Sequence, residues 1–380
     1  MALPIEDYAL IGDCETSALV GLNGSIDWLC LPRFDSEACF SALLGDDNNG
    51  RWQIAATDPK AKVTRRYRPD TLILETRFET ETGSATLIDF MYPCEQHPNV
   101  IRLVVGEKGT VEFGIELIVR FGYGEAVPWV TTMPDGRLRL IAGPSRIVLQ
   151  SSVELRGENL KTKGTFMIKK GETESFALTY TESWIPEPVE FEPELLIAGT
   201  EKFWTDWTSK CTTIGPYAEI VKRSLITLKA MTYEPTGGVI AATTTSLPEQ
   251  FGGPRNWDYR FCWVRDATLT LLALMNTGYY DEACSWREWL LRAVAGSPRQ
   301  MQIMYGIAGE RRLYEVELPW LKGYEDSQPV RIGNAAHHQV QLDVYGELLD
   351  AIHQARKGGL APLQSGRDLQ LAIVEQLEEV

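Results

Sequence analysis

The chain has 380 residues, a formal net charge of -15 and a composition that is 44% hydrophobic and 23% charged. This length accommodates two domains or one unusually large fold, and the composition is that of a globular protein with a substantial core. An acidic chain repels nucleic acid and anionic membranes, so we expect neither as a partner. No apolar run approaches the roughly 20 residues of a membrane span, and the first residues do not resemble a secretion signal. We therefore expect a soluble, cytoplasmic protein.

The cysteines and histidines do not indicate a metal centre. The cysteines are odd in number, scattered and without a C-x-x-C pair, which is typical of free thiols in a reducing compartment. They are Cys14, Cys30, Cys39, Cys94, Cys211, Cys262 and Cys284. The four histidines form no H-E-x-x-H motif. We expect no metal and no cofactor.

Residues 1–185 have the pattern of a β domain. Short segments rich in Val, Ile, Thr and Phe alternate with Gly- and Asp/Asn-rich turns. The candidate strands are Thr71–Thr80, Ala85–Phe90, Val100–Val105, Thr110–Arg120, Arg137–Ile141 and Phe176–Tyr180. In the first of them, every second residue from Leu72 to Phe78 would face the core. Many strands without intervening helices predict an antiparallel β-sandwich.

The pattern becomes helical after a proline-rich linker, assigned to residues 186–215 together with a first helix. The candidate helices are Glu194–Cys211, Tyr217–Thr232, Ala267–Asn276, Asp281–Ala295, Asn334–Arg356 and Ser365–Glu379. The third is apolar nearly all round, which predicts burial among other helices. In the fifth, an apolar residue at every fourth position from Val340 to Ile352 predicts a core stripe. Residues 216–380 therefore read as a stack of α-hairpins.

A long loop from Gly237 to Arg265 carries an unusual number of aromatic residues. Trp257, Tyr259, Phe261 and Trp263 occupy every second position, with charged residues among them. One interpretation is that the rings close the edge of a core and that Asp266 N-caps the next helix. The other is a sugar site, because pyranose rings stack on aromatic faces and their hydroxyls need charged donors and acceptors. On this view Arg265 and Asp266 supply the donor and the acceptor.

A second long loop, Met301–Asn334, is also aromatic and acidic. Loops longer than about 12–15 residues within a compact domain are frequently functional. Tyr305, Trp320 and Tyr324 are further stacking candidates, whereas most of its carboxylates are expected to be solvated surface. In a closed ring of hairpins the two loops would meet at one end.

Three stretches resemble bacterial members of glycoside hydrolase family 15. They are Pro4–Asp46, Ser246–Ala267 (SLPEQFGGPRNWDYRFCWVRDA) and Glu317–Ile352, and the similarity extends over essentially the whole chain. The resemblance implies a β-sandwich followed by an (α/α)6 barrel, of which this chain would contain only the first part. It also implies hydrolysis of α-glucosidic bonds from the non-reducing end with inversion, as in glucoamylases and trehalases.

The resemblance also implies roles for individual residues. Arg265 and Asp266 match the pair that holds the hydroxyls of the terminal glucose, and three neighbours in the same motif would line that pocket. These neighbours are Trp257, Asp258 and Tyr259. Residues of the second loop would form a further wall of the pocket: Tyr305, Trp320 and Arg331.

The catalytic carboxylates cannot be assigned by the motifs. Inversion requires a general acid and a general base about 6.5–9.5 Å apart. In the family that the chain resembles, both come from later in the barrel, so they are expected after Val380. Glu249, Asp258 and Glu310 lie in suitable loops, but we do not expect them to substitute. The chain itself is thus expected to be inactive, and helix faces left without partners predict self-association.

Two other functions fit the same residues. One is a non-catalytic carbohydrate-sensing or regulatory module, and the other is an interaction module in which the sandwich binds protein. The choice between trehalose, maltooligosaccharides and other α-glucosides is open at this point, as is the oligomeric state.

Overall fold

The computed structural model describes residues 2–93, 97–295, 298–361 and 364–378. The chain divides into two compact units. The first, here called the β unit, comprises Met1–Asp206 and Pro319–Gln328, and the second, the helical unit, comprises Trp207–Leu318 and Pro329–Val380. Pro319–Gln328 thus groups with the strands, although the sequence places it among the helices.

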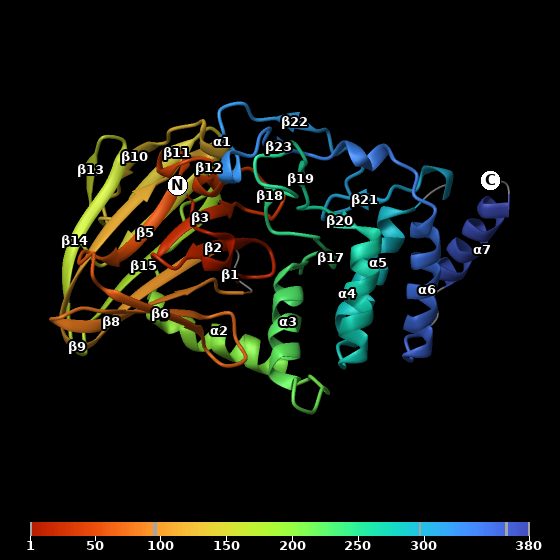
Figure 1. Ribbon diagram of the computed structural model, residues 1–380, viewed down its shortest axis with the longest axis horizontal. Helices are drawn as coiled ribbons and strands as arrows, with labels where there is room; N and C mark the ends of the chain where they lie inside the picture. Colours follow the sequence, from red (N-terminus) through yellow and green to blue (C-terminus); the bar gives the residue numbers. More distant parts are fainter. Residues whose placement is uncertain (1, 94–96, 296–297, 362–363, 379–380) are drawn as a thin grey trace. The chain divides into compact units, whose positions relative to one another are not determined.

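In the described part of the β unit, 15 strands form one hydrogen-bonded antiparallel sheet (Figure 1). Its central path runs β1-β2-β3-β5-β9-β15-β12-β11-β10. The strands are β1 (Tyr8–Gly12), β2 (Ser17–Gly21), β3 (Ser25–Cys30), β4 (Ala38–Phe40), β5 (Arg51–Ala56), β6 (Lys62–Tyr67), β7 (Leu74–Glu79), β8 (Gly83–Phe90), β9 (Asn99–Ile118), β10 (Trp129–Thr132), β11 (Leu138–Ala142), β12 (Ser145–Ser151), β13 (Arg156–Glu158), β14 (Lys161–Lys169) and β15 (Thr173–Glu182).

Strand β9 joins the two layers of this sheet. Its first half pairs with β8 and β15, and its second half pairs with β5 and β14. The prediction of two separate strands here, Val100–Val105 and Thr110–Arg120, is wrong. The turn-like residues between them stay within one strand because Gly109, whose φ is 60°, still pairs with Gly83, and Thr110 pairs with Lys169. Partner strands on both sides satisfy the backbone without a turn.

Aromatic side chains fill the space between the layers. Phe113 of β9 contacts Phe78 of β7 and Phe166 of β14, with ring centroids 5.5 and 5.7 Å apart. Phe166 in turn lies 5.9 Å from Phe176 of β15. The alternation predicted from Leu74 to Phe78 is confirmed, since both residues are buried and Arg77 between them is not. Each fully buried ring contributes about 1.5–3 kcal/mol, so this core stabilises the unit strongly.

Six α-helices and one short turn, α1, are described; Gly122 and Tyr123 of α1 have left-handed φ values of 60° and 58°, and most of the helices lie in the helical unit. They are α1 (Phe121–Gly124), α2 (Pro193–Thr208), α3 (Ala218–Ala230), α4 (Val264–Asn276), α5 (Tyr280–Ala293), α6 (Asp343–Lys357) and α7 (Gln364–Glu378). Four two-stranded ribbons accompany them: β16 (Thr232–Tyr233) with β17 (Gly238–Val239), β18 (Thr245–Pro248) with β19 (Asn256–Asp258), β20 (Cys262–Trp263) with β21 (Met304–Tyr305), and β22 (Val316–Glu317) with β23 (Arg331–Ile332). Helix α4 contacts both α5 and α6.

Two helix predictions need correction. The predicted helix Asn334–Arg356 is broken into a short 3-10 turn, Ala335–His338, and α6, because Gln339 is extended. Val340 lies in the break and is 78% exposed, so it is wrongly assigned to the core stripe, whereas Val344 and Leu348 are buried as predicted. Nor is α4 buried all round, since Leu269 on its outer side is exposed.

The remaining sequence predictions concern the cysteines, membrane-spanning helices and metal sites. The described cysteines are free thiols, and Cys94 lies outside the described residues, as does the predicted last helical residue Glu379. No helix in the described residues combines the length and the apolar character needed to cross a membrane. In the same residues, no cluster of three or more His, Cys, Asp or Glu side chains could hold a metal ion.

Candidate functional site

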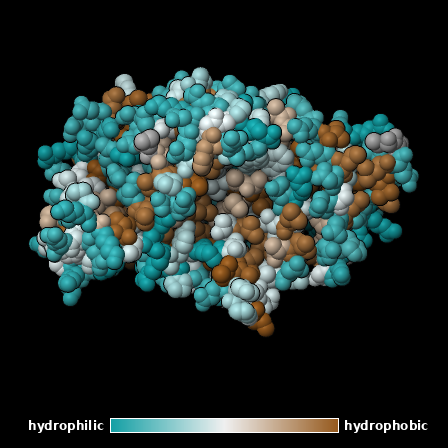
Figure 2. All heavy atoms as spheres, viewed as in Figure 1, coloured by the Kyte–Doolittle hydropathy of each residue, from teal (hydrophilic) through white to brown (hydrophobic). Residues whose placement is uncertain are grey.

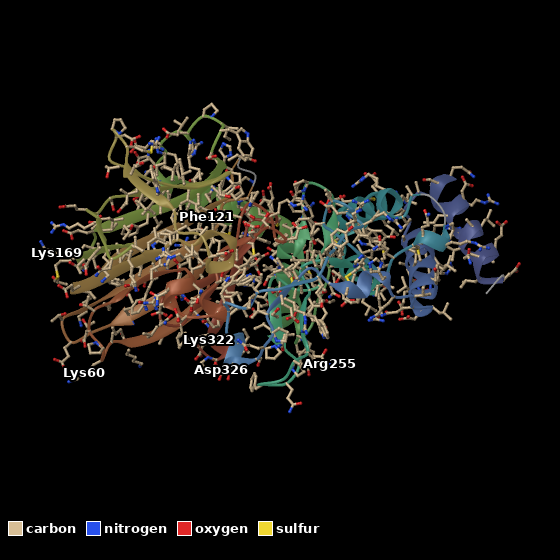
Figure 3. All side chains as sticks on the ribbon, turned by 90° about the horizontal axis from the view of Figure 1, so that it is seen from above. Lys60, Phe121, Lys169, Arg255, Lys322 and Asp326 are labelled. Atoms are coloured by element: carbon tan, nitrogen blue, oxygen red, sulfur yellow. The ribbon has the colours of Figure 1, made fainter. Side chains whose placement is uncertain are left out.

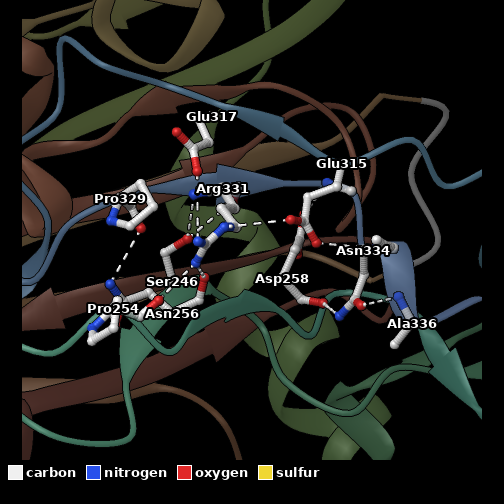
Figure 4. A network of polar contacts seen from close by, with 12 residues as sticks. Ser246, Pro254, Asn256, Asp258, Glu315, Glu317, Pro329, Arg331, Asn334 and Ala336 are labelled. Atoms are coloured by element: carbon white, nitrogen blue, oxygen red, sulfur yellow. Dashed lines mark hydrogen bonds and ion pairs between the residues drawn. The ribbon is translucent and has the colours of Figure 1, made fainter.

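The two long loops pair with each other through the parts of them that belong to the helical unit. Ribbon β20–β21 pairs Cys262 with Tyr305, and a polar network joins the first loop to the strand around Arg331 (Figure 4). In this network the backbone N–H of Arg331 donates to Oγ of Ser246 at 2.8 Å. These contacts fix the loops as one surface.

Asp258 is a structural centre of this network. Its carboxylate accepts from Nε and Nη2 of Arg260 at 2.9 and 2.6 Å, and also from the N–H of Gly333 at 3.1 Å. Its carbonyl accepts from Nδ2 of Asn334 at 3.0 Å. Asp258 and Arg260 are 0% and 1% exposed. Asp258 therefore holds the loops together from inside, which differs from the pocket-lining position predicted for it.

Arg331 positions one of the candidate stacking residues. Its guanidinium lies over the ring of Trp257, 4.6 Å from the centroid, and Nη1 donates to the carbonyl of Pro254 at 2.8 Å. Glu315 and Glu317 form longer ion pairs with it, at 3.4 and 3.5 Å. Trp257 remains half-exposed, so part of its ring is available to a ligand.

Tyr305 and Trp320 lie in different surroundings from those expected. Tyr305 is fully buried, its hydroxyl accepts from the N–H of Gln302 at 2.8 Å, and burial raises the pKa of that hydroxyl. Its ring packs edge-on against Trp289. Trp320 belongs to the β unit, where its Nε1 donates to the carbonyl of Tyr123 at 3.0 Å. Lys322 and Asp326, which Figure 3 labels, belong to the same segment as Trp320, Pro319–Gln328 of the β unit.

Arg265 and Asp266 occupy the first turn of α4. The helix begins at Val264, three residues earlier than predicted, and Trp263 is its N-cap. Asp266 is consequently the third helical residue, and the interpretation of Asp266 as N-cap is wrong. Its exposed carboxylate interacts favourably with the positive end of the helix dipole.

The guanidinium of Arg265 pairs with α6. Nη1 lies 2.8 Å from Oδ2 of Asp343 and 3.3 Å from Oε1 of Gln341. The hydrogen bond to Asp343 raises the pKa of Arg265 and lowers that of Asp343, with Asp266 and Glu347 adding negative charge nearby. The guanidinium thus bonds one carboxylate and lies within the electrostatic influence of two more. Such a group offers acceptors and a donor to the hydroxyls of a neutral ligand.

Aromatic residues continue this surface. Tyr259 and Trp263 have ring centroids 5.8 Å apart and are half-exposed. Burial, assisted by the carboxylates of Glu249 and Asp266, raises the pKa of Tyr259. Hydrogen bonds from Arg255 and from Trp257 lower the pKa of Glu249. Figure 3 shows Arg255 at the outer end of its loop.

We define the polar-aromatic surface as Trp257, Tyr259, Trp263, Arg265, Asp266, Asp343 and Glu347. Sequence reasoning missed its last two members. Their spacing of four residues, which puts both carboxylates on one face of a helix, was the available signal. No sequence motif connects them to Arg265, because α4 and α6 are in contact but lie far apart in the sequence.

Comparison with known proteins identifies the family. The family described as "Glycosyl hydrolases family 15" matches residues 215–380, and "Trehalase-like, N-terminal" matches residues 1–164. A trehalase of Mycolicibacterium smegmatis is 34% identical over 92% of this chain and 57% of its own length. Trehalase 1 of Sulfolobus acidocaldarius is 35% identical over 93% of this chain and 61% of its own length.

A solved structure of a bacterial glucoamylase complexed with acarbose is similar in fold. The TM-score is 0.60 at 12% identity, and the alignment covers 100% of this chain and 67% of that one. At this identity the similarity concerns the fold alone. The chain spans less than two thirds of the length of the two trehalases.

Proposed function

Because this chain belongs to glycoside hydrolase family 15, we propose that it serves the hydrolysis of an α-glucosidic bond, with trehalose as the first candidate substrate. The similarity to two trehalases over more than nine tenths of the chain supports this substrate. We also propose that the helical unit is part of an (α/α)6 barrel and that cleavage is exo-acting and inverting. The glucoamylase-like fold is consistent with that architecture.

The polar-aromatic surface is the proposed glucose-binding site. In this proposal Arg265 donates to one sugar hydroxyl, Asp266 accepts from another, and Trp257 and Tyr259 offer their faces to the ring. A half-exposed guanidinium that bonds one carboxylate and lies within the electrostatic influence of two more, beside two half-exposed rings, carries the proposal. Sugars are recognised by this combination of stacking and charge-assisted hydrogen bonds.

We propose supporting roles for the other predicted residues. Arg331 holds Trp257 in place, and Asp258 ties the two loops together. Tyr305 supports the start of α4 through the pairing of β20 with β21. Trp320 acts within the β unit by holding the carbonyl of Tyr123.

The general acid and base are proposed to lie outside the two loops. A general acid needs a raised pKa, whereas Arg255 lowers the pKa of Glu249. Asp258 is sealed from solvent by Arg260 and Gly333. Glu310 accepts from the backbone of Ala308 at 2.9 Å. The chain is therefore expected to bind sugar without cleaving it.

Incubation of the chain with trehalose, maltose and maltotriose tests both parts of the proposal. Glucose release is assayed with the Mycolicibacterium smegmatis trehalase as positive control, and binding is measured by calorimetry. We expect saturable trehalose binding that Arg265→Ala weakens, and no glucose release. Failure to bind any of the three sugars would contradict the proposed site. Turnover by the chain would contradict the assignment of the acid and base to other parts of the protein.

A further inference from the structure

Arg120, between β9 and α1, is a buried cation without a carboxylate partner among the described residues. It is 7% exposed, and its two hydrogen bonds go to backbone carbonyls, from Nη1 to Val119 at 2.7 Å and from Nη2 to Leu160 at 3.1 Å. Burial lowers the pKa of its guanidinium. A guanidinium has five N–H donors, so donors remain for another acceptor. Buried charges in proteins are normally paired, which makes this one a candidate ligand contact.

Arg120 lines a cavity of about 550 Å³ at the open end of the two layers. The cavity lies between the β10–β11 hairpin and the β13–β14 hairpin, which adjoin at the upper left of Figure 1. Its inner wall is aliphatic and includes the buried Leu117 and Leu140. Trp129 and Leu160 at its rim are 84% and 72% exposed. Apolar side chains gathered in this way at a concave surface are typical of a binding site.

The rim is held in a strained conformation by the same arginine. Asn159 and Leu160 have φ values of 51° and 60° in the turn between β13 and β14. The left-handed region favours glycine, and a leucine there costs about 1–3 kcal/mol. The carbonyl of Leu160 accepts from Arg120, so the turn that shapes the rim also fixes the guanidinium.

The other lining charges already have partners. Lys161 lies 3.6 Å from Glu116, and Glu158 lies 3.6 Å from Lys163. Among the described lining residues, Arg120 is consequently the charge that a ligand can neutralise. The cavity differs from the polar-aromatic surface in this respect, because the guanidinium of Arg265 is paired with a carboxylate and that of Arg120, among the described residues, is not.

We propose that this cavity binds an organic carboxylate with an aliphatic or aromatic body. The carboxylate pairs with the free N–H groups of Arg120, and the body packs against Leu140 and under the ring of Trp129. Ion pairing is favourable here because folding has already removed most of the water around this cation, so binding adds little further desolvation of the guanidinium. The proposal is independent of the proposed glycosidase function.

Octanoate and 3-phenylpropionate are the probes, with 1-octanol as the uncharged match. Binding to the whole chain is measured by calorimetry and by tryptophan fluorescence. We expect octanoate to bind at least about tenfold more tightly than 1-octanol, which corresponds to about 1.4 kcal/mol. Arg120→Gln should remove this preference for the carboxylate. Trp129→Ala should weaken the binding of both carboxylates severalfold, whereas Trp184→Ala, at another strongly exposed tryptophan (71%), should leave it unchanged.

Thermal unfolding of each variant separates loss of binding from loss of the fold. If Arg120→Gln does not fold, Trp129→Ala and the comparison of octanoate with 1-octanol still decide the matter, because neither disturbs a buried group. Equal binding of octanoate and 1-octanol would overturn the proposal. It would be overturned equally by a folded Arg120→Gln variant with unchanged octanoate affinity, or by absence of saturable binding of both carboxylates.

Discussion

Nη1 of Arg265 lies 2.8 Å from Oδ2 of Asp343, 78 residues further along the chain, although Asp266 is its immediate neighbour. The side chains are 42% and 51% exposed, so water screens the ion pair and it contributes little to stability. The main effect of this ion pair is therefore to orient the guanidinium of Arg265. It aims the guanidinium across the first turns of α4 and α6, and leaves the carboxylate of Asp266 free.

Arg265→Ala should impair ligand binding much more than folding. We expect trehalose affinity to fall at least about tenfold, while the free energy of unfolding changes by about 0.5 kcal/mol or less. Calorimetry and urea unfolding measure the two effects. Arg156→Ala is the matched control, because this arginine is 80% exposed and ion-paired with Glu154 in the β unit. Equal trehalose affinity in both variants would refute the role of Arg265.

Removing one partner of the Asp258–Arg260 pair should destabilise the helical unit. Asp258→Asn removes the negative partner of this buried ion pair, and breaking a buried pair costs about 3–5 kcal/mol. Urea unfolding measures this loss, with Asp343→Asn in the exposed pair as the control for removing a carboxylate. A loss of trehalose binding by Asp258→Asn at unchanged stability would show instead that Asp258 contacts the ligand directly.

Asp13 makes the stability of the β unit pH-dependent. It is 6% exposed, and burial raises its pKa to about 7 although the N–H groups of Glu15 and Thr16 donate to it. The folded state therefore holds this proton more tightly than the unfolded chain, in which the pKa is about 3.9. Its contribution to stability is complete below about pH 4 and is lost as the pH rises through 7, in total about 4 kcal/mol.

Asp13→Asn retains an acceptor for both N–H groups and cannot ionise. We expect it to be more stable than the parent at pH 8 and to flatten the dependence of unfolding free energy on pH between 4 and 8. Asp135→Asn is the control, since Arg137 lowers the pKa of this exposed carboxyl. Unchanged pH dependence in Asp13→Asn would show that other groups govern it.

Exposed apolar residues of α7 should drive self-association. Leu371 and Val374 are 57% and 45% exposed, and Figure 2 shows hydrophobic side chains at the surface around this helix. Replacing both by glutamate should shift the chain toward monomer in sedimentation velocity at increasing concentration. Val189→Glu, at an 84% exposed site in the β unit, controls for added charge. A chain that is monomeric throughout would contradict this expectation.

Local patterns in the sequence predicted which side of a strand and which side of a helix are buried. The alternation up to Phe78 identified a buried strand face, and the spacing of Val344 and Leu348 identified the buried side of α6. Predictions from local sequence patterns failed where contacts with other parts of the chain determine the structure. The centre of β9 continues as one strand because neighbouring strands pair with it, even at Gly109 with its φ of 60°. Val340 lies outside the core because Gln339 ends the preceding turn.

In the candidate site, too, features set by neighbouring residues could be predicted and features set by distant residues could not. The motif located Arg265 and Asp266 at a helix start, but nothing local could reveal that Asp343 holds the guanidinium. Tyr305 looked like an exposed stacking residue because its loop is long and polar, yet pairing of β20 with β21 buries it completely. Residue type alone does not separate an aromatic ring that meets a ligand from one that supports the backbone.

The affiliation of Pro319–Gln328 with the β unit has a consequence for any attempt to separate the halves. The polypeptide passes between the two units three times, so neither corresponds to one uninterrupted stretch of gene. A fragment ending at Asp206 would lack the donors that Trp320 and Tyr324 provide to the carbonyls of Tyr123 and Leu3. A gene rearrangement that moved either unit as one continuous segment would therefore carry part of the other unit with it or leave part of its own behind.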